Sequence, residues 1–185
     1  MMGRLRAGAA VVVLTGLAAT TPGVANAASA VEIDARADLA LDGLLATSVA
    51  AQAVAERAVA VLVFPQIVKA GFGVGGQFGE GALRRDGVTV AYYNIASASF
   101  GFQIGAQAYA QVLFFMTEDA VALLDRAQGF QLGADANVAV IDRGFGVDVT
   151  STTVFDPVVA FVTDQQGLMA GATIEGSKIT RIEPR

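Results

Sequence analysis

Glycine at alternate positions between residues 71 and 81 limits what this chain can fold into more than any other feature of the sequence. A period of two indicates a β-strand, in which successive side chains point to opposite faces. One face of this strand carries apolar side chains, and the opposite face is almost bare. A bare face lets a ligand or another backbone approach closely. The glycine-rich strand contains Gly71, Gly73, Gly75, Gly76, Gly79 and Gly81.

The segment before these glycines predicts a short strand followed by a turn. Val61–Phe64 is an apolar β-type run. We expect this run to end at Pro65, because proline cannot donate a hydrogen bond to a sheet. Gln66–Ala70 would then turn the chain and present Lys69 next to the glycines.

Three helices are predicted from capping residues and apolar spacing. Ser29 and Glu32 form a capping box that begins a helix from about Ala30 to Ala46. Ser48 is expected to begin a second helix that runs through Arg57, and Thr117 a third that ends at Gly129. The first helix is expected to pack on a sheet through Ile33, Ala37, Ala40, Leu41, Leu44 and Leu45.

Further strands follow the glycines. Asp86-Gly87 predicts a tight hairpin turn, and a strand from Val88 to about Ile95 follows it. Residues 96–116 alternate for longer than one regular strand, so we expect a bend or bulge near Ser99–Gly101. The remaining strands are predicted at Phe130–Val140, Val147–Phe155, Val158–Thr163 and Leu168–Ile182. The predicted fold is α+β, with a curved, mostly antiparallel, barrel-like sheet of roughly six to eight strands and helices packed against it.

The first 27 residues have the pattern of a secretory signal peptide. Arg4 and Arg6 precede the apolar run Ala7–Ala19, and Ala25-Asn26-Ala27 is an A-x-A cleavage signal. We therefore expect residues 28–185 to form one exported, periplasmic domain. The sequence has no cysteine, which excludes disulfides and a cysteine-anchored lipoprotein. The formal net charge of −5, without a basic run, argues against nucleic-acid binding.

The residue types present argue against an enzyme. Histidine and cysteine are both absent, which removes the commonest general bases and nucleophiles. Ser177 and Lys178 are adjacent in a predicted strand and would point to opposite faces. The G-x-G-x-x-G pattern at residues 71–76 precedes a strand pattern rather than a helix, so it does not predict nucleotide binding. The spacing of Asp135, Asn137 and Asp142 fits no calcium loop, so no cofactor or metal is expected.

Four motifs resemble the SYLF domain family, a group of lipid-binding modules of bacteria and eukaryotes. They are VFPQIVKAGFGVGGQFGEG, YYNIASASFGFQIGAQ, FFMTEDA and GLMAGATIEGSKITRI, and the resemblance covers about residues 50–182. It implies a non-enzymatic domain that binds phospholipid or a membrane surface. Lys69 and Lys178 lie inside these motifs and would hold a lipid phosphate if the sheet brings them together. Arg84 and Arg181 are further candidates for lipid contact.

Two other functions stay open at this point. A protein-interaction or scaffold module of the cell envelope would use the Gln-rich odd positions of the long alternating segment as a docking surface, among them Gln103, Gln107 and Gln111. A small outer-membrane barrel would also fit export and alternation. It is disfavoured by the two N-terminal helices, the absence of tryptophan and the lack of a C-terminal aromatic residue.

Overall fold

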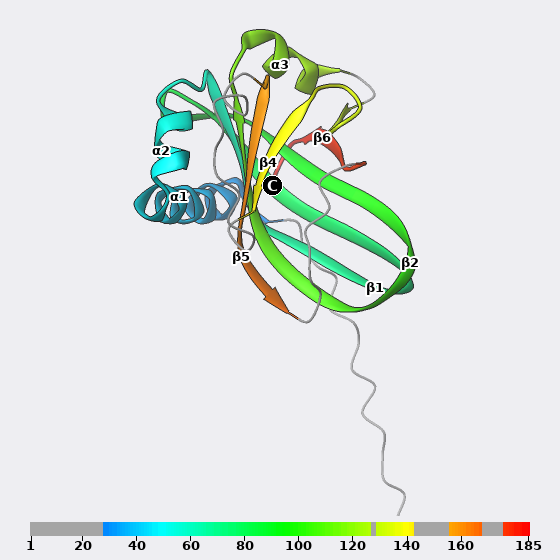
Figure 1. Cartoon of the computed structure of the whole chain (residues 1–185). Helices are drawn as coiled ribbons and strands as arrows, with labels where there is room; N and C mark the ends of the chain where they lie inside the picture. Colours follow the sequence, from blue (N-terminus) through cyan, green and yellow to red (C-terminus); the bar gives the residue numbers. More distant parts are fainter. Residues whose placement is uncertain (1–27, 127–128, 143–155, 168–175) are drawn as a thin grey trace, which may run out of the picture.

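The computed structural model describes residues 28–126, 129–142, 156–167 and 176–185 (Figure 1). These residues form one curled sheet with helices on its outer side and at one end, which confirms the α+β class. In the described part of the chain the sheet has six strands, ordered β3-β6-β2-β5-β4 with β1 paired to β2. All pairs are antiparallel except β4 with β5. The strands are β1 (Ala60–Arg85), β2 (Val88–Phe115), β3 (Phe130–Gln131), β4 (Val138–Asp142), β5 (Val158–Gly167) and β6 (Lys178–Ile182).

Strands β1 and β2 form a long ribbon that bends over on itself (Figure 1). The two strands are joined by Asp86 and Gly87, whose φ angles of 50° and 77° confirm the predicted tight turn. The register shifts where Phe72 pairs with Ile104 and Val74 pairs with Phe100. This shift confirms the irregularity expected near Ser99–Gly101, and such bulges bend a strand and increase its twist.

The strand end predicted at Pro65 is wrong, and so is the turn predicted at Gln66–Ala70. Strand β1 continues through Pro65, with a register shift between Phe64 and Ile67. A bulge leaves a residue outside the ladder, so the missing N–H of proline is tolerated there. Lys69 therefore lies within β1, paired with Gln107 of β2, and not on a turn.

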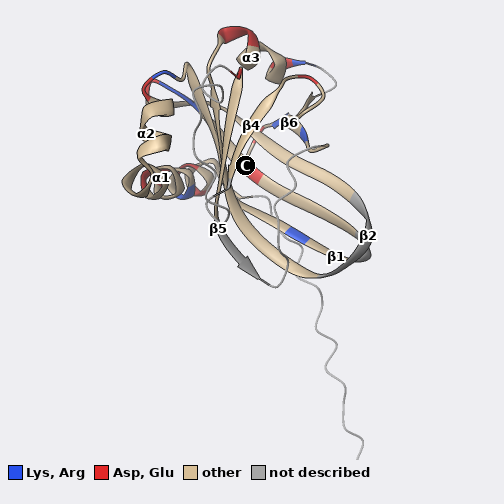
Figure 2. Cartoon of the chain, viewed as in Figure 1, with Lys and Arg blue, Asp and Glu red and all other residues tan. Residues whose placement is uncertain are grey.

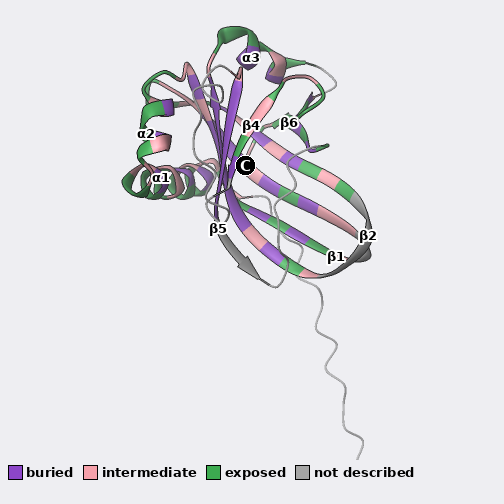
Figure 3. Cartoon of the chain, in the orientation of Figure 1, coloured by how far each residue is buried: buried purple, intermediate pink, exposed green. Residues whose placement is uncertain are grey.

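Two apolar cores lie on the two faces of the sheet. The inner core fills the curl and includes Leu124 next to helix α3 (Glu118–Ala122). The outer core lies between the sheet and helices α1 (Ala30–Thr47) and α2 (Val49–Ala55). Figure 3 shows the corresponding alternation of buried and exposed positions along β1 and β2.

The predicted caps of all three helices are present. The Ser29 hydroxyl accepts the Glu32 N–H at 3.3 Å, and the Ser48 hydroxyl accepts the Ala51 N–H at 3.2 Å. The Thr117 hydroxyl accepts the Ala120 N–H at 3.2 Å. These bonds satisfy backbone donors that the first turn of a helix leaves without partners. The apolar face predicted for α1 is buried at Ile33, Ala37 and Leu44.

Several predicted boundaries change in the structure. Helix α3 and the 3₁₀ turn Leu123–Asp125 end earlier than expected, because Arg126 has extended backbone angles. The strand predicted at Phe130–Val140 is divided into β3 and β4 by a turn with Gly133 at φ 81°. The strand predicted at 147–155 and the start of that predicted at 168–182 lie outside the described residues. Strand β6 lies between β2 and β3, so the C-terminal strand is integral to the sheet.

No single helix in the described ranges is long and apolar enough to cross a membrane. Helices α1 and α2 are long and apolar enough only when they are taken together, and their axes differ by 116°.

Candidate functional site

Lys69 lies on the inner face of the curled sheet. Its neighbours Val68 and Ala70 are exposed, whereas Ile67 on the same face as Lys69 belongs to the inner core. Lys69 is only 7% exposed, and its pairing partner Gln107 is 2% exposed. Within the described part of the chain, Lys69 has no ion-pair or hydrogen-bond partner. Strand β2, which runs beside it, contains no charged residue.

Other polar side chains accompany Lys69 inside the curl. Gln77 donates to the Ser177 hydroxyl at 2.7 Å and accepts from the Tyr109 hydroxyl at 2.7 Å. Gln111 is fully buried, and neither its amide oxygen nor its amide nitrogen has a partner among the described residues. Burial raises the pKa of Tyr109 to about 12. Five of these residues lie on the inner face of the ribbon, and Ser177 reaches them from just before β6; together we call them the inner polar row: Lys69, Gln77, Gln107, Tyr109, Gln111 and Ser177.

Glycines within β1 let the two halves of this strand pack closely against each other. A Cβ on Gly81 would overlap the Val63 carbonyl oxygen, and one on Gly79 would lie 2.7 Å from the Gln66 oxygen. A Cβ on Gly76 would approach the Ser97 oxygen at 3.3 Å, which is tight but less severe. Gly79 and Gly81 are therefore required by packing between the two arms of β1. Gly71 and Gly75 are half-buried, and Gly73 lies at the register shift.

The two candidate arginines are engaged in ion pairs. Arg84 pairs with Asp38 at 2.6 Å and donates to the Asp34 carbonyl oxygen at 3.1 Å, which ties the end of β1 to α1. Arg181 pairs with Asp125 at 3.5 Å. Figure 2 shows this charge gathered on the helices and at the strand ends, while the β1–β2 ribbon is almost without charge. The two arginines therefore neutralise acidic side chains of the chain itself.

The structure does not bring Lys69 and Lys178 into one site. Lys178 is exposed, whereas Ser177 and Ile179 on either side of it are buried, so Lys178 points away from the inner face. Its side chain lies over Gly129, at a hollow of about 300 Å³ that Arg126 and Asp135 also line. The opposite orientations of Ser177 and Lys178 confirm that these two cannot form a direct pair.

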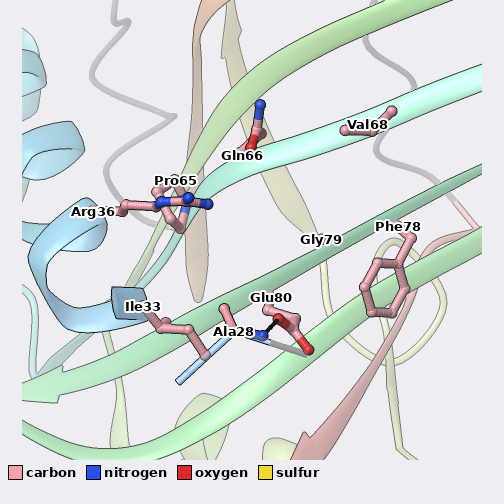
Figure 4. Close-up of a pocket in the computed structure, with 9 residues that line it drawn as sticks. All are labelled: Ala28, Ile33, Arg36, Pro65, Gln66, Val68, Phe78, Gly79 and Glu80. Atoms are coloured by element: carbon pink, nitrogen blue, oxygen red, sulfur yellow. Dashed lines mark hydrogen bonds between the residues drawn. The ribbon is translucent and has the colours of Figure 1, made fainter. Parts of the chain in front are cut away.

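A second concave region lies on the outer side of β1, next to α1 (Figure 4). Val68 and Phe78 stand at its rim, and they are 48% and 50% exposed. The hollow measures about 160 Å³ and adjoins a larger one of about 350 Å³ that Leu39 and Arg36 line. We call the first hollow the outer groove; it is lined by Ala28, Ile33, Arg36, Pro65, Gln66, Val68, Phe78, Gly79 and Glu80.

The docking surface expected on the odd positions of the long segment is wrong where the structure describes it. Gln107 and Gln111 face the inner core and are buried, and the side chain of Gln103 lies outside the described residues. The sequence carried a signal for this burial, because Leu113 and Phe115 continue the same odd positions. Sequence reasoning also missed Gln77 and Tyr109, whose contact depends on the bend of the ribbon.

In the described ranges, no group of three or more acidic residues is placed to hold a metal ion. Asp135, considered above as an oxygen ligand, instead pairs with Arg126 at 3.0 Å and accepts the Gln131 N–H at 2.8 Å.

Comparison with known proteins found a family match over part of the chain. Residues 96–183 match the model of the Ysc84 family, whose description is Las17-binding protein actin regulator. The matched region begins within β2 and ends after β6, so it contains Gln107, Gln111 and Lys178, whereas Lys69 precedes it. No match was found among curated proteins.

Proposed function

We propose that this chain, in which residues 96–183 match the Ysc84 (SYLF) family, is an exported, non-enzymatic module that binds phospholipid. The resemblance to lipid-binding SYLF domains supports this function. The pattern of Arg4, Arg6 and Ala25-Asn26-Ala27 supports export. The domain would act in the periplasm and associate peripherally with an envelope membrane.

The observation that carries the lipid proposal is the position of Lys69. A lysine ammonium close to an apolar interior is unfavourable unless water or an anion neutralises it. Lys69 has no acidic partner in the described part of the chain, and its residual exposure of 7% leaves the side chain accessible from solvent. A lipid phosphate supplies the missing negative charge and accepts charge-assisted hydrogen bonds.

The second half of the site would come from Gln111. Among the described residues, neither the amide nitrogen nor the amide oxygen of Gln111 has a partner, and a polar headgroup could pair with both. In this arrangement Lys69 contacts the phosphate, and Lys178 on the other face has no part in binding.

Vesicle co-sedimentation tests this proposal. We expect the processed protein to bind vesicles that contain an anionic phospholipid, and Lys69→Met to weaken binding at least about tenfold, the size of one charge-assisted hydrogen bond. Lys178→Met is the matched control, because it removes the other lysine of the chain from an exposed position. Equal binding by wild type and Lys69→Met would contradict the proposed site.

A protein-interaction role is the second candidate, and the outer groove favours it. Val68 and Phe78 expose apolar surface next to Arg36, as protein-interaction sites often do. The description of the matched family also names a protein that its members bind. If no vesicle composition is bound, a photo-crosslinker at position 78 should capture one defined envelope protein, and a crosslinker at exposed position 53 of α2 should not.

A further inference from the structure

Glu80 accepts a hydrogen bond from the backbone nitrogen of Ala28 at 3.1 Å (Figure 4). Glu80 is the one acidic residue in the sequence of β1, and 52 positions separate it from Ala28. Ala28 is also the residue that follows the Ala25-Asn26-Ala27 cleavage signal. The backbone nitrogen that donates to Glu80 is therefore the atom that would become the N-terminal amine after cleavage.

We propose that the Glu80 carboxylate binds the α-ammonium group that signal-peptide cleavage creates on Ala28. In the cleavage step, water adds across the Ala27–Ala28 amide, whose C–N bond breaks. Ala27 leaves with a carboxylate, and Ala28 keeps the nitrogen as an ammonium. The inference rests on the export part of the proposed function and is independent of lipid binding.

The surroundings of Ala28 hold this nitrogen in place. Ala28 is half-buried and packs against the outer core, and the next residue, Ser29, caps α1. The position of the nitrogen is therefore fixed by a helix cap on one side and by apolar contact on the other. Glu80 does not have to order a flexible chain end, and that ordering is what usually weakens a surface ion pair.

The charges around the outer groove leave the Glu80 carboxylate available to the ammonium. Arg36 of α1 also lines the groove, but it pairs with Glu32 on the exposed side of the helix. The positive end of the α1 dipole disfavours a cation next to it, and an acidic side chain from β1 offsets that effect. Cleavage replaces the hydrogen bond from the amide N–H to the carboxylate by an ion pair with the same geometry. A hydrogen bond from an ammonium is stronger than one from a neutral amide.

Thermal unfolding of the processed protein tests this inference. The full chain is expressed in an exporting host, purified after processing, and examined by intact mass. Half of the sample is then acetylated near neutral pH, where the α-amine reacts before Lys69 and Lys178. At pH 7 we expect the free-amine form to melt about 2 °C above the acetylated form, the shift that a weak ion pair gives in a domain of this size.

The difference should depend on Glu80 and on pH. It should disappear in Glu80→Gln and persist in Glu32→Gln, which removes an exposed pair on α1. It should also disappear at pH 10, because an α-amine loses its proton above about pH 8. If Glu80→Gln does not fold, the comparison of the two wild-type forms at both pH values still decides.

Three results would overturn the inference. A mature mass that corresponds to an N-terminus other than Ala28 would show that cleavage occurs elsewhere. Equal melting temperatures of the two forms at pH 7 would show that the ion pair does not stabilise the fold. A difference that persists in Glu80→Gln assigns the effect to another group. Each of these leaves the vesicle assay unaffected, so failure of this inference is distinct from failure of the lipid proposal.

Discussion

The buried charge of Lys69 does not favour stability of the fold, but the proposed function requires it. It is almost buried and has no acidic partner among the described residues. Lys69→Met replaces the ammonium with an apolar group of similar length. We predict that this variant equals wild type in stability or exceeds it by about 1 kcal/mol in urea unfolding, while it loses lipid binding. A loss of 3 kcal/mol or more would show instead that the charge is structural.

Gly81 is needed for the close approach of the two arms of β1. A Cβ at this position would overlap the backbone of Val63 and the ring of Phe64. We therefore expect Gly81→Ala to lower the free energy of unfolding by about 2–3 kcal/mol. A Cβ on Gly43 of α1 would have no other atom within 4 Å, so Gly43→Ala should raise stability by about 0.5–1 kcal/mol. Similar effects at both positions in chemical denaturation would contradict this account of the strand.

Tyr109 makes the stability of the fold sensitive to alkaline pH. Burial raises its pKa from 10.0 to about 12, so the folded protein keeps the phenol protonated where the unfolded chain releases the proton. The stabilisation from this group is complete below pH 10 and is lost as pH rises from about 10 to 12, for a total of about 2–3 kcal/mol. Tyr109→Phe should lack this component in denaturation series from pH 8 to 11.5. An unchanged alkaline slope would exclude Tyr109 as its source.

At the scale of elements, helix α1 is attached to the ribbon through Asp34. Its carboxylate accepts the Thr89 hydroxyl at 2.8 Å and the Tyr92 hydroxyl at 2.9 Å, and Arg84 lies 3.8 Å away. We predict that Asp34→Ala lowers the free energy of unfolding by about 2 kcal/mol, because it removes hydrogen bonds to a charged acceptor. Asp42→Ala on the same helix is the control and should change stability little. Equal effects of the two substitutions would show that these bonds do not hold α1.

The sequence predicts these elements well where the signal is local. Ser29, Ser48 and Thr117 each cap a helix as expected, and Asp86-Gly87 makes the predicted turn. The strand end predicted at Pro65 was wrong because proline ends a strand only in a regular ladder, whereas β1 has a bulge at this position. A bulge depends on pairing with a distant strand, and a local pattern does not report such pairing.

The candidate site was less predictable than the elements, because it depends on how the ribbon bends. Sequence motifs placed Lys69 and Lys178 near family-like glycines, but only the sheet register shows that they face opposite sides. The bend also brings Gln77 to Tyr109, 32 positions away along the chain. The role of the four cations in lipid binding stays a prediction, and our proposal assigns phosphate binding to Lys69 alone.

At the scale of the whole molecule, a ribbon with few charged residues has two buried polar side chains, Lys69 and Gln111, without partners among the described residues. Helices α1 and α2 cover the outer face at one end of the ribbon, and α3 lies against the inner core (Figure 1). The unpartnered amide of Gln111 and the ammonium of Lys69 are left on the inner side. Buried polar groups in folded proteins are normally satisfied, and the lipid proposal therefore uses these two side chains.

Native mass spectrometry of the processed protein, purified from its own envelope and followed by lipid extraction, tests this central claim most directly. We predict a co-purifying phospholipid on wild type and on Lys178→Met, and its loss from a folded Lys69→Met variant. A wild-type mass without lipid, together with no binding to vesicles of native lipids, would contradict the claim and assign the outer groove to a protein partner.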